Sequence, residues 1–215
     1  MSQLTLVRHG QAHPFQRENG RLTTLGEQQA AKLAQFWLRT KVRFDEVQHG
    51  TLPRQVRTAE VIGECFRAAG ERWPEPSPDA AWNEYDAQGV LRHLTIPDDP
   101  REFQRMFEAA MTGWLEAGEQ DGVESWPAFR TRVSGAIQQI MAGPSSRRVA
   151  VFTSGGPIGF TVQCALAAPA RAFLDVNWRV RNTSFTHFLF DRSRLTLDCF
   201  NSFPHLDDVS FWTYR

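Results

Sequence analysis

Three short segments of the chain carry residues suited to binding an anion. Arg8–Gly10 lies near the N-terminus, Leu52–Ala59 contains Arg54 and Arg57, and Thr153–Gly156 ends in two glycines. Glycines let the backbone approach a ligand closely, and the amides at a helix start are free to bind an anion. Arginines near a helix start add a guanidinium whose geometry matches phosphate oxygens. Together the segments predict a phosphate pocket.

The elements expected around two of these segments bring them to one edge of a sheet. Residues 3–8 and 149–152 contain apolar runs typical of strands that are buried on both faces. A helix is predicted to follow Gly156 and to continue to about residue 167. Ligands of open α/β sheets bind beyond the carboxyl ends of the strands. His9 and Ser154 are therefore expected to lie near one site.

The rest of the chain alternates between helical and strand patterns. The predicted fold class is α/β, with three layers: a mostly parallel sheet, helices on both of its faces, and an antiparallel edge strand near the C-terminus. Thr24 is the expected cap of the first helix. Helices are predicted over residues 25–39, 53–70, 101–117 and 126–142, and further strands over 42–47, 184–190 and 195–200.

The length of 215 residues predicts a single domain, residues 1–215, with a variable insertion at about 85–120. The insertion is expected to be lid-like and of mixed character. Its aromatic residues Phe103, Phe107 and Trp114 are expected either to line an apolar mouth or to pack on the core. The size and type of the substrate would depend on which of these holds.

Composition limits the classes of partner. Lys+Arg and Asp+Glu are both 24, so the formal charge of zero predicts no bulk attraction to nucleic acid or to a membrane surface. Cys65, Cys164 and Cys199 are an odd number without a CxxC motif, which favours reduced thiols and a cytoplasmic location. A charge at Arg8 argues against a signal peptide. The oligomeric state stays open.

Six ordered blocks resemble the histidine phosphatases, also called the phosphoglycerate mutase-like superfamily, and they span nearly the whole chain. A lone Arg-His-Gly would be weak evidence, whereas six blocks in the family's order are specific. The blocks are residues 6–12, 22–30, 52–59, 82–85, 151–156 and 182–184, the last with a closing His205 and Leu206.

The resemblance implies a phosphomonoester hydrolase that acts on a small phosphorylated metabolite or a phosphoprotein. His9 would be the nucleophile and would carry the phosphoryl group as phosphohistidine. Arg8 and Arg54 would bind phosphate oxygens, with Ser154 and Gly155 as further phosphate-binding positions. Glu84 would be the general acid, although its neighbour Asp86 is a rival. The resemblance implies no metal and no cofactor.

The sequence departs from the family pattern at three positions. Ser154 stands where the family has its second histidine, and loss of one oriented donor costs about two to three powers of ten in rate. The variant Ser154→His is therefore predicted to raise phosphatase activity. Phe15 falls near a frequent phosphate-contacting asparagine, and Gly50 replaces a frequent serine. His13, His49 and Arg57 are candidates for a compensating donor.

These departures keep other functions open. The first is a catalytically weak or inactive member of the same fold that binds phosphate or a phosphoprotein. The second is a serine hydrolase, because Ser154 is followed by Asp175 or Asp198 and then by His205 in the chain order of an α/β-hydrolase triad. That reading leaves Arg8 and His9 unexplained. Zinc binding by His9 and His13 is disfavoured because Gly10 and Pro14 predict a loop.

Overall fold

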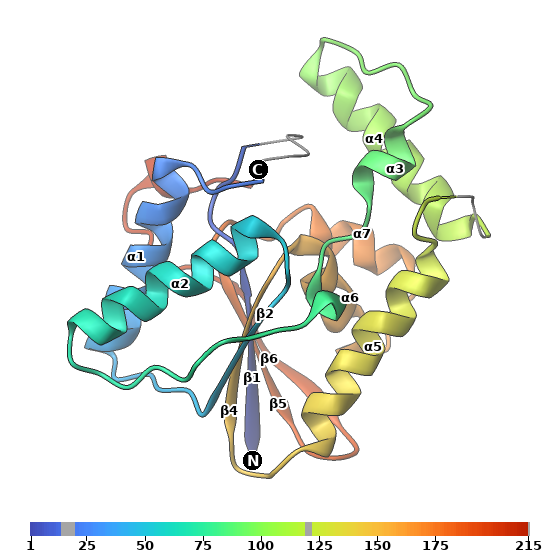
Figure 1. Ribbon diagram of the computed structural model, residues 1–215. Helices are drawn as coiled ribbons and strands as arrows, with labels where there is room; N and C mark the ends of the chain where they lie inside the picture. The colour runs from blue at the N-terminus through green and yellow to red at the C-terminus, as the bar shows by residue number, and fades with distance from the viewer. Residues whose placement is uncertain (14–19, 119–121, 215) are drawn as a thin grey trace.

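The chain folds around one six-stranded sheet, as the computed structural model in Figure 1 shows for residues 1–13, 20–118 and 122–214. The strand order is β3-β2-β4-β1-β5-β6. The first four strands in this order are parallel, whereas β5 runs antiparallel to both β1 and β6. The strands are β1 (Ser2–Arg8), β2 (Glu46–His49), β3 (Ser77–Pro78), β4 (Arg148–Thr153), β5 (Phe185–Phe190) and β6 (Leu195–Ser202).

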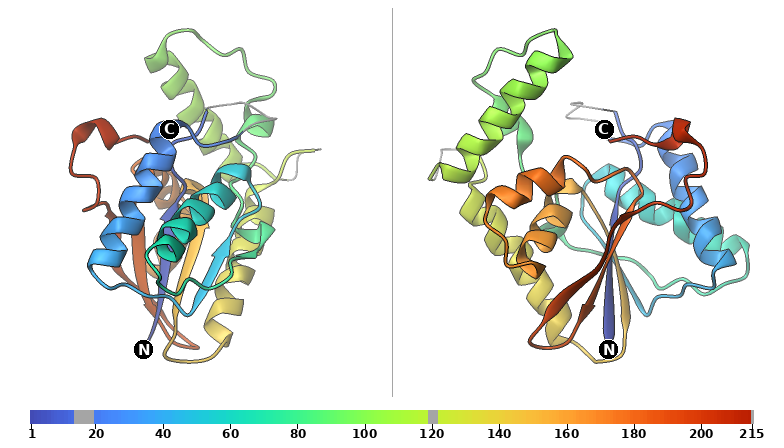
Figure 2. Two further views of the ribbon diagram at one scale, coloured as in Figure 1. Left: turned by 60° about the vertical axis from the view of Figure 1, so that its left-hand side comes forward. Right: turned by 180° about the vertical axis from the view of Figure 1, so that it is seen from behind.

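Helices cover both faces of the sheet, which Figure 2 shows from two sides. α1 and α2 pack on one face over Val7 and Phe152, and α5 and α6 pack on the other face over Leu6 and Val151. Alternate residues of β1 and β4 thus belong to two separate cores, as strand geometry requires. The observed fold confirms the predicted class. The longer helices are α1 (Thr24–Arg39), α2 (Pro53–Ala68), α4 (Pro100–Glu116), α5 (Trp126–Ala142) and α6 (Gly155–Ala165).

Several element boundaries differ from the sequence-based expectation. α1 is capped by Thr23, whose hydroxyl accepts from the Gly26 amide at 3.0 Å, rather than by Thr24. The second strand begins at Glu46 and not at residue 42, because the Val42 amide still bonds to the Trp37 carbonyl in the turn after α1. The short helix α7 (Arg171–Asn177) was not predicted, since no side chain caps its start.

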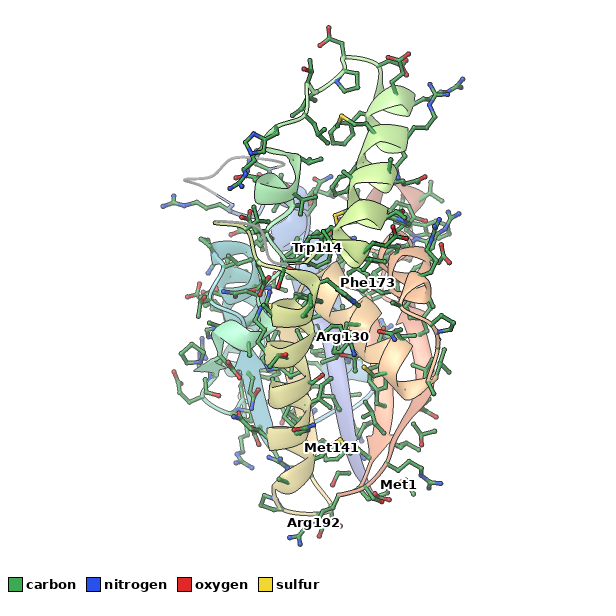
Figure 3. All side chains as sticks on the ribbon, turned by 90° about the vertical axis from the view of Figure 1, so that its right-hand side faces the viewer. Met1, Trp114, Arg130, Met141, Phe173 and Arg192 are labelled. Atoms are coloured by element: carbon green, nitrogen blue, oxygen red, sulfur yellow. The ribbon has the colours of Figure 1, made fainter. Side chains whose placement is uncertain are left out.

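Residues 85–120 contain α3 (Ala87–Leu91) and α4, and α4 rises beyond the carboxyl end of the sheet (Figure 1). Figure 3 shows Trp114, near the base of α4, beside Phe173 of α7. Their ring centroids lie 6.3 Å apart, and Trp114 also packs on Trp126 and Phe129. α4 is thus held to the core at its base by aromatic contacts. Within the described ranges, no helix combines the length and apolar character needed to cross a membrane.

Candidate active site

The segment after β1 and the segment after β4 lie side by side at the carboxyl edge of the sheet. Arg8 pairs with Thr153 in the parallel register, and the His9 amide donates to the Thr153 carbonyl at 2.9 Å. Parallel strands end at the same edge, which is where α/β folds bind their ligands. A cavity of about 1130 Å³ opens there, and Arg8, His9, Arg54 and Glu84 are among its lining residues.

The His9 ring is held in one tautomer. Its Nδ1 lies 2.7 Å from the Gly10 carbonyl oxygen, and because a carbonyl can only accept, Nδ1 carries the hydrogen. Nε2 accepts a hydrogen bond from Arg54 Nε at 3.0 Å. Burial, and then the charges of Arg54 and Arg8, hold the pKa of His9 well below its usual range. The ring is therefore neutral, with a lone pair on Nε2.

Two arginines bring positive charge to this ring from different elements. Arg54 lies in the first turn of α2, and burial lowers the pKa of its guanidinium while Glu84 opposes that shift. Arg8 ends β1 and donates through Nη1 to the Val180 carbonyl. Because guanidinium groups stay protonated in proteins, both side chains place a fixed charge beside His9.

Glu84 is held by the start of α6. Its two carboxylate oxygens accept from the Gly156 amide at 3.0 and 3.1 Å, and one of them accepts from the Tyr85 amide at 3.1 Å. A Cβ atom at residue 156 would lie 2.0 Å from Glu84 Oε1, so this contact requires glycine there. Burial raises the pKa of Glu84, although the Gly156 bond and Arg54 act in the opposite direction.

Asp86 lines the same cavity but is engaged differently. Its carboxylate accepts from the Gly89 amide at 2.8 Å and caps α3, and its side chain is exposed. Glu84 is the carboxylate that electrostatically couples to both Arg54 and Arg8. The geometry therefore brings Glu84, rather than Asp86, into the group around His9.

Ser154 is fully buried, and its hydroxyl accepts from Gln55 Nε2 at 2.9 Å. Neither Ser154 nor Gly155 is among the described residues that line the cavity. Gln55 also donates to the Trp82 carbonyl at 3.1 Å. A Cβ atom at Gly50 would lie 2.0 Å from Gln55 Oε1. The Gln55 amide thus occupies the space next to Ser154 and Gly50, two of the three positions at which the sequence was expected to depart from the family pattern.

Sequence reasoning missed Gln55, although helical spacing contains a signal for it. Gln55 lies on the same face of α2 as Thr58, Ala59 and Ile62, at offsets of three, four and seven residues, and all four are buried. A polar side chain on a buried helix face needs hydrogen-bond partners. That requirement marks Gln55 as a residue that ties elements together.

The three candidates for a compensating donor differ in whether they line the cavity. His13 lines the cavity. Nδ1 of His49 lies 2.9 Å from the Gly50 carbonyl oxygen, and the Arg57 guanidinium forms ion pairs with Glu27, Glu60 and Glu64. Phe15 lies outside the described residues. Phe107 lines the cavity, as an apolar mouth requires, whereas Trp114 packs on the core.

The alternative sites are not assembled in the described ranges. His205 Nε2 lies 3.0 Å from the Thr183 hydroxyl, and the Ser154 hydroxyl is bonded to Gln55, so the two do not form a serine–histidine pair. Residues 1–13, 20–118 and 122–214 contain no cluster of three or more His, Cys, Asp or Glu side chains suited to a metal ion.

Comparison with known proteins identifies relatives of this fold. The family model of the histidine phosphatase superfamily (branch 1) matches residues 4–202. Three similar solved structures are YhfR of Bacillus stearothermophilus, a phosphoserine phosphatase variant of Entamoeba histolytica bound to phosphoserine, and phosphoglycerate mutase of Bacillus anthracis. Their TM-scores are 0.72, 0.68 and 0.67 and their identities 20%, 19% and 15%. The alignments cover 96%, 96% and 95% of this chain and 100%, 100% and 95% of the others. No curated protein matches the sequence significantly.

Proposed function

The chain belongs to the histidine phosphatase superfamily, and on this premise we propose that it hydrolyses phosphate monoesters through a phosphohistidine on His9. The observation that carries the proposal is the fixed tautomer of His9. The Gly10 carbonyl takes the Nδ1 hydrogen, and the lone pair of Nε2 faces Arg54. A neutral imidazole with an oriented lone pair is a competent nucleophile near neutral pH.

The proposed reaction has two steps. Nε2 of His9 attacks phosphorus, the bond to the leaving oxygen breaks, and Glu84 donates its proton to that oxygen, so an alcohol departs. Water then attacks phosphorus and gives a proton to Glu84, the bond between phosphorus and Nε2 of His9 breaks, and inorganic phosphate leaves. Arg8 and Arg54 stabilise the charge on the transferring group in both steps. No step requires a metal.

The cavity supports a substrate larger than inorganic phosphate. Its volume of about 1130 Å³ is sufficient for a small phosphorylated metabolite or for a phosphorylated side chain of a protein. Beyond His9 the wall includes Phe107, Trp178 and Arg179. Hydrolysis is favoured over a mutase reaction because the exposed Asp86 and Arg179 lie in this wall, so that water has access to a phosphoenzyme.

The free thiols of the three cysteines support a cytoplasmic location.

A second candidate function is phosphate binding with little or no turnover. The specific observation is that Ser154 is buried and bonded to Gln55 outside the cavity wall. The donor that the resemblance expects at this position is then missing from the pocket, and the rate would fall by about two to three powers of ten.

Hydrolysis of p-nitrophenyl phosphate in excess EDTA distinguishes these functions. We expect turnover that survives the chelator and is lost in His9→Ala, while circular dichroism and thermal unfolding show an intact fold. Appreciable turnover in purified His9→Ala would contradict the role of His9. No turnover on this substrate or on a panel of alkyl phosphates that includes phosphoserine, with calorimetric binding of inorganic phosphate retained, would instead establish the binding function.

A further inference from the structure

We propose that the C-terminal segment Phe211–Thr213 positions His9, and that the hydroxyl of Thr213 is the group through which it acts. This inference deepens the proposed function, because it rests on that function only for what His9 does. The segment lies outside residues 4–202, which the family model matches. Figure 2 shows it running beside α1, at the end of the molecule where β1 ends.

The backbone around His9 is fixed by bonds from several elements. The Gly10 amide donates to the Thr58 hydroxyl at 3.1 Å, and the Gln11 amide donates to Gln29 Oε1 at 2.8 Å. The His9 carbonyl accepts from Asn182 Nδ2 at 3.0 Å. Because the Gly10 carbonyl orients the His9 ring, the position of this backbone sets the direction of the Nε2 lone pair.

Thr213 joins two of these supports. Its hydroxyl accepts from Gln29 Nε2 at 2.8 Å and donates to Asn182 Oδ1 at 2.8 Å. Gln29 Nε2 also donates to the Phe211 carbonyl at 2.8 Å, and the backbone amide of Asn182 donates to the Thr213 carbonyl at 2.9 Å. One hydroxyl therefore connects the side chain that holds Gln11 with the side chain that holds His9.

Both partners of Thr213 are fully buried. Gln29 uses both amide hydrogens and its oxygen in the bonds just described, so loss of one partner leaves a buried polar atom unsatisfied. Neither side chain can turn to water as an alternative. Loss of the Thr213 hydroxyl is therefore expected to displace Gln29 and Asn182, and with them the backbone at residues 9–11.

The segment has anchors that do not depend on this hydroxyl. Trp212 Nε1 donates to the Leu206 carbonyl at 2.9 Å. The Arg181 guanidinium lies over the rings of Phe203, Trp212 and Tyr214 at 4.2, 5.3 and 4.9 Å from their centroids. These contacts should keep the segment in place when the hydroxyl is removed. The effect of a variant at residue 213 can then be attributed to the position of His9, and not to detachment of the C-terminal segment.

The test compares Thr213→Val, which keeps the volume and removes the hydroxyl, with Thr213→Ser, which keeps the hydroxyl. Ser210→Ala is the matched control, because it removes a hydroxyl from the same stretch without contacting Gln29 or Asn182. On p-nitrophenyl phosphate we expect Thr213→Val to lower kcat by roughly 10- to 100-fold, since a displacement of about 1 Å has such an effect, with KM little changed. Thr213→Ser and Ser210→Ala should stay close to the natural protein.

A second measurement does not depend on turnover. The His9 ring is followed by nitrogen-15 NMR through a pH titration, with His9→Ala assigning its signals. Thr213→Val should shift the His9 ring signals and move its pKa toward the ordinary value, whereas Thr213→Ser should not. Should the natural protein show no turnover, the proposed function fails and this measurement alone decides the inference.

Two results would overturn the inference. One is a Thr213→Val protein with the kcat and the His9 spectrum of the natural protein. The other is a Thr213→Ser protein as impaired as Thr213→Val, which would mean that packing at this position matters and the hydroxyl does not. Thr213→Ala repeats the comparison without the added methyl group in case Thr213→Val folds poorly, with thermal unfolding measured for every variant.

Discussion

His9 and Glu84 have pKa values shifted in opposite directions, and the signs predict how rate depends on pH. In the proposed mechanism His9 acts as the neutral ring, so kcat/KM should rise as pH increases through its lowered pKa. In the same mechanism Glu84 acts in its protonated form, so kcat/KM should fall as pH increases through its raised pKa. The profile should therefore be bell-shaped, with the acid limb due to His9 and the alkaline limb due to Glu84.

The variant Glu84→Gln tests this assignment. It should lose the alkaline limb and lower kcat/KM for an alkyl phosphate such as phosphoserine by about 10²- to 10⁴-fold, the usual contribution of a general acid. The loss should be smaller for p-nitrophenyl phosphate, whose leaving group departs without a proton. Asp86→Asn is the control. An alkaline limb that persists in Glu84→Gln and disappears in Asp86→Asn would assign the acid role to Asp86.

Ser154 and Gln55 carry a second prediction at the residue scale. The sequence alone predicts that Ser154→His raises activity. The Gln55 amide, however, lies 2.9 Å from the hydroxyl of the buried Ser154, so we expect a larger imidazole at residue 154 to clash with it. We expect Ser154→His alone not to raise kcat. The pair Ser154→His with Gln55→Ala should exceed Gln55→Ala by about 10²- to 10³-fold, the value of one oriented donor. Steady-state kinetics of the four proteins decides it, and a gain from the single variant would contradict the coupling.

The loop that carries Glu84 is held by side chains of neighbouring elements, among them Arg132 of α5. Arg132 of α5 donates to the carbonyls of Ala81 and Asn83 at 2.8 and 2.7 Å, and its Nη2 donates to Glu124 at 2.8 Å. Together with the bonds from Gln55 and Thr153 to the Trp82 carbonyl, these contacts fix the loop from both sides. The proposed catalytic acid, which lies on an irregular segment, thereby acquires a defined position.

Arg132→Met is expected to free this loop. The half-buried carbonyls of Ala81 and Asn83 lose a charged donor in this variant, which should lower the free energy of unfolding by about 1 kcal/mol. We expect kcat to fall more for phosphoserine than for p-nitrophenyl phosphate. Arg130→Met is the matched control, since Arg130 lies on the same helix (Figure 3). Its side chain is exposed, and its guanidinium lies over the Trp126 ring. Urea unfolding and kinetics measure both effects. Equal changes in the two variants would show that Arg132 has no special role.

Elements defined by long apolar patterns could be predicted from the sequence, whereas those defined by tertiary contacts could not. β4 contains the continuous apolar run Val149–Phe152, and β1 contains Leu4, Leu6 and Val7, so the positions of both strands follow from strand physics. The adjacency of His9 to Thr153 follows from the parallel pairing of the two strands. α7 has seven residues and no side-chain cap, so it depends on packing against α6. The motifs indicated Arg54 and Glu84. Helical spacing marks Gln55 as a buried polar residue, but its partner Ser154 lies far away in the sequence. The roles of Gln29 and Thr213 likewise arise from partners far apart in the sequence, which no local pattern contains.

At the scale of the whole molecule, a neutral chain concentrates cations at one end of its sheet. Burial lowers the pKa of the Arg54 guanidinium and that of His9, so the surroundings disfavour a positive charge on each group. An anion that enters would relieve this cost, because it pairs with the buried arginines. Binding to the folded state alone then stabilises the whole fold by mass action.

Inorganic phosphate should therefore raise the unfolding temperature. At 100 times its Kd, a ligand adds about 2.7 kcal/mol, which corresponds to roughly 5–11 °C for a protein of this size. Arg54→Met should leave the unfolding temperature without phosphate unchanged or higher, because a buried charge is gone, and should remove most of the phosphate effect. Arg57 lies on the same helix but is ion-paired with Glu27, Glu60 and Glu64 outside the cavity, so Arg57→Met should keep the phosphate effect.

Phosphate also stabilises proteins by exclusion from their surfaces, so Arg54→Met measures that background. Equal stabilisation of all three proteins would mean that the pocket does not bind phosphate.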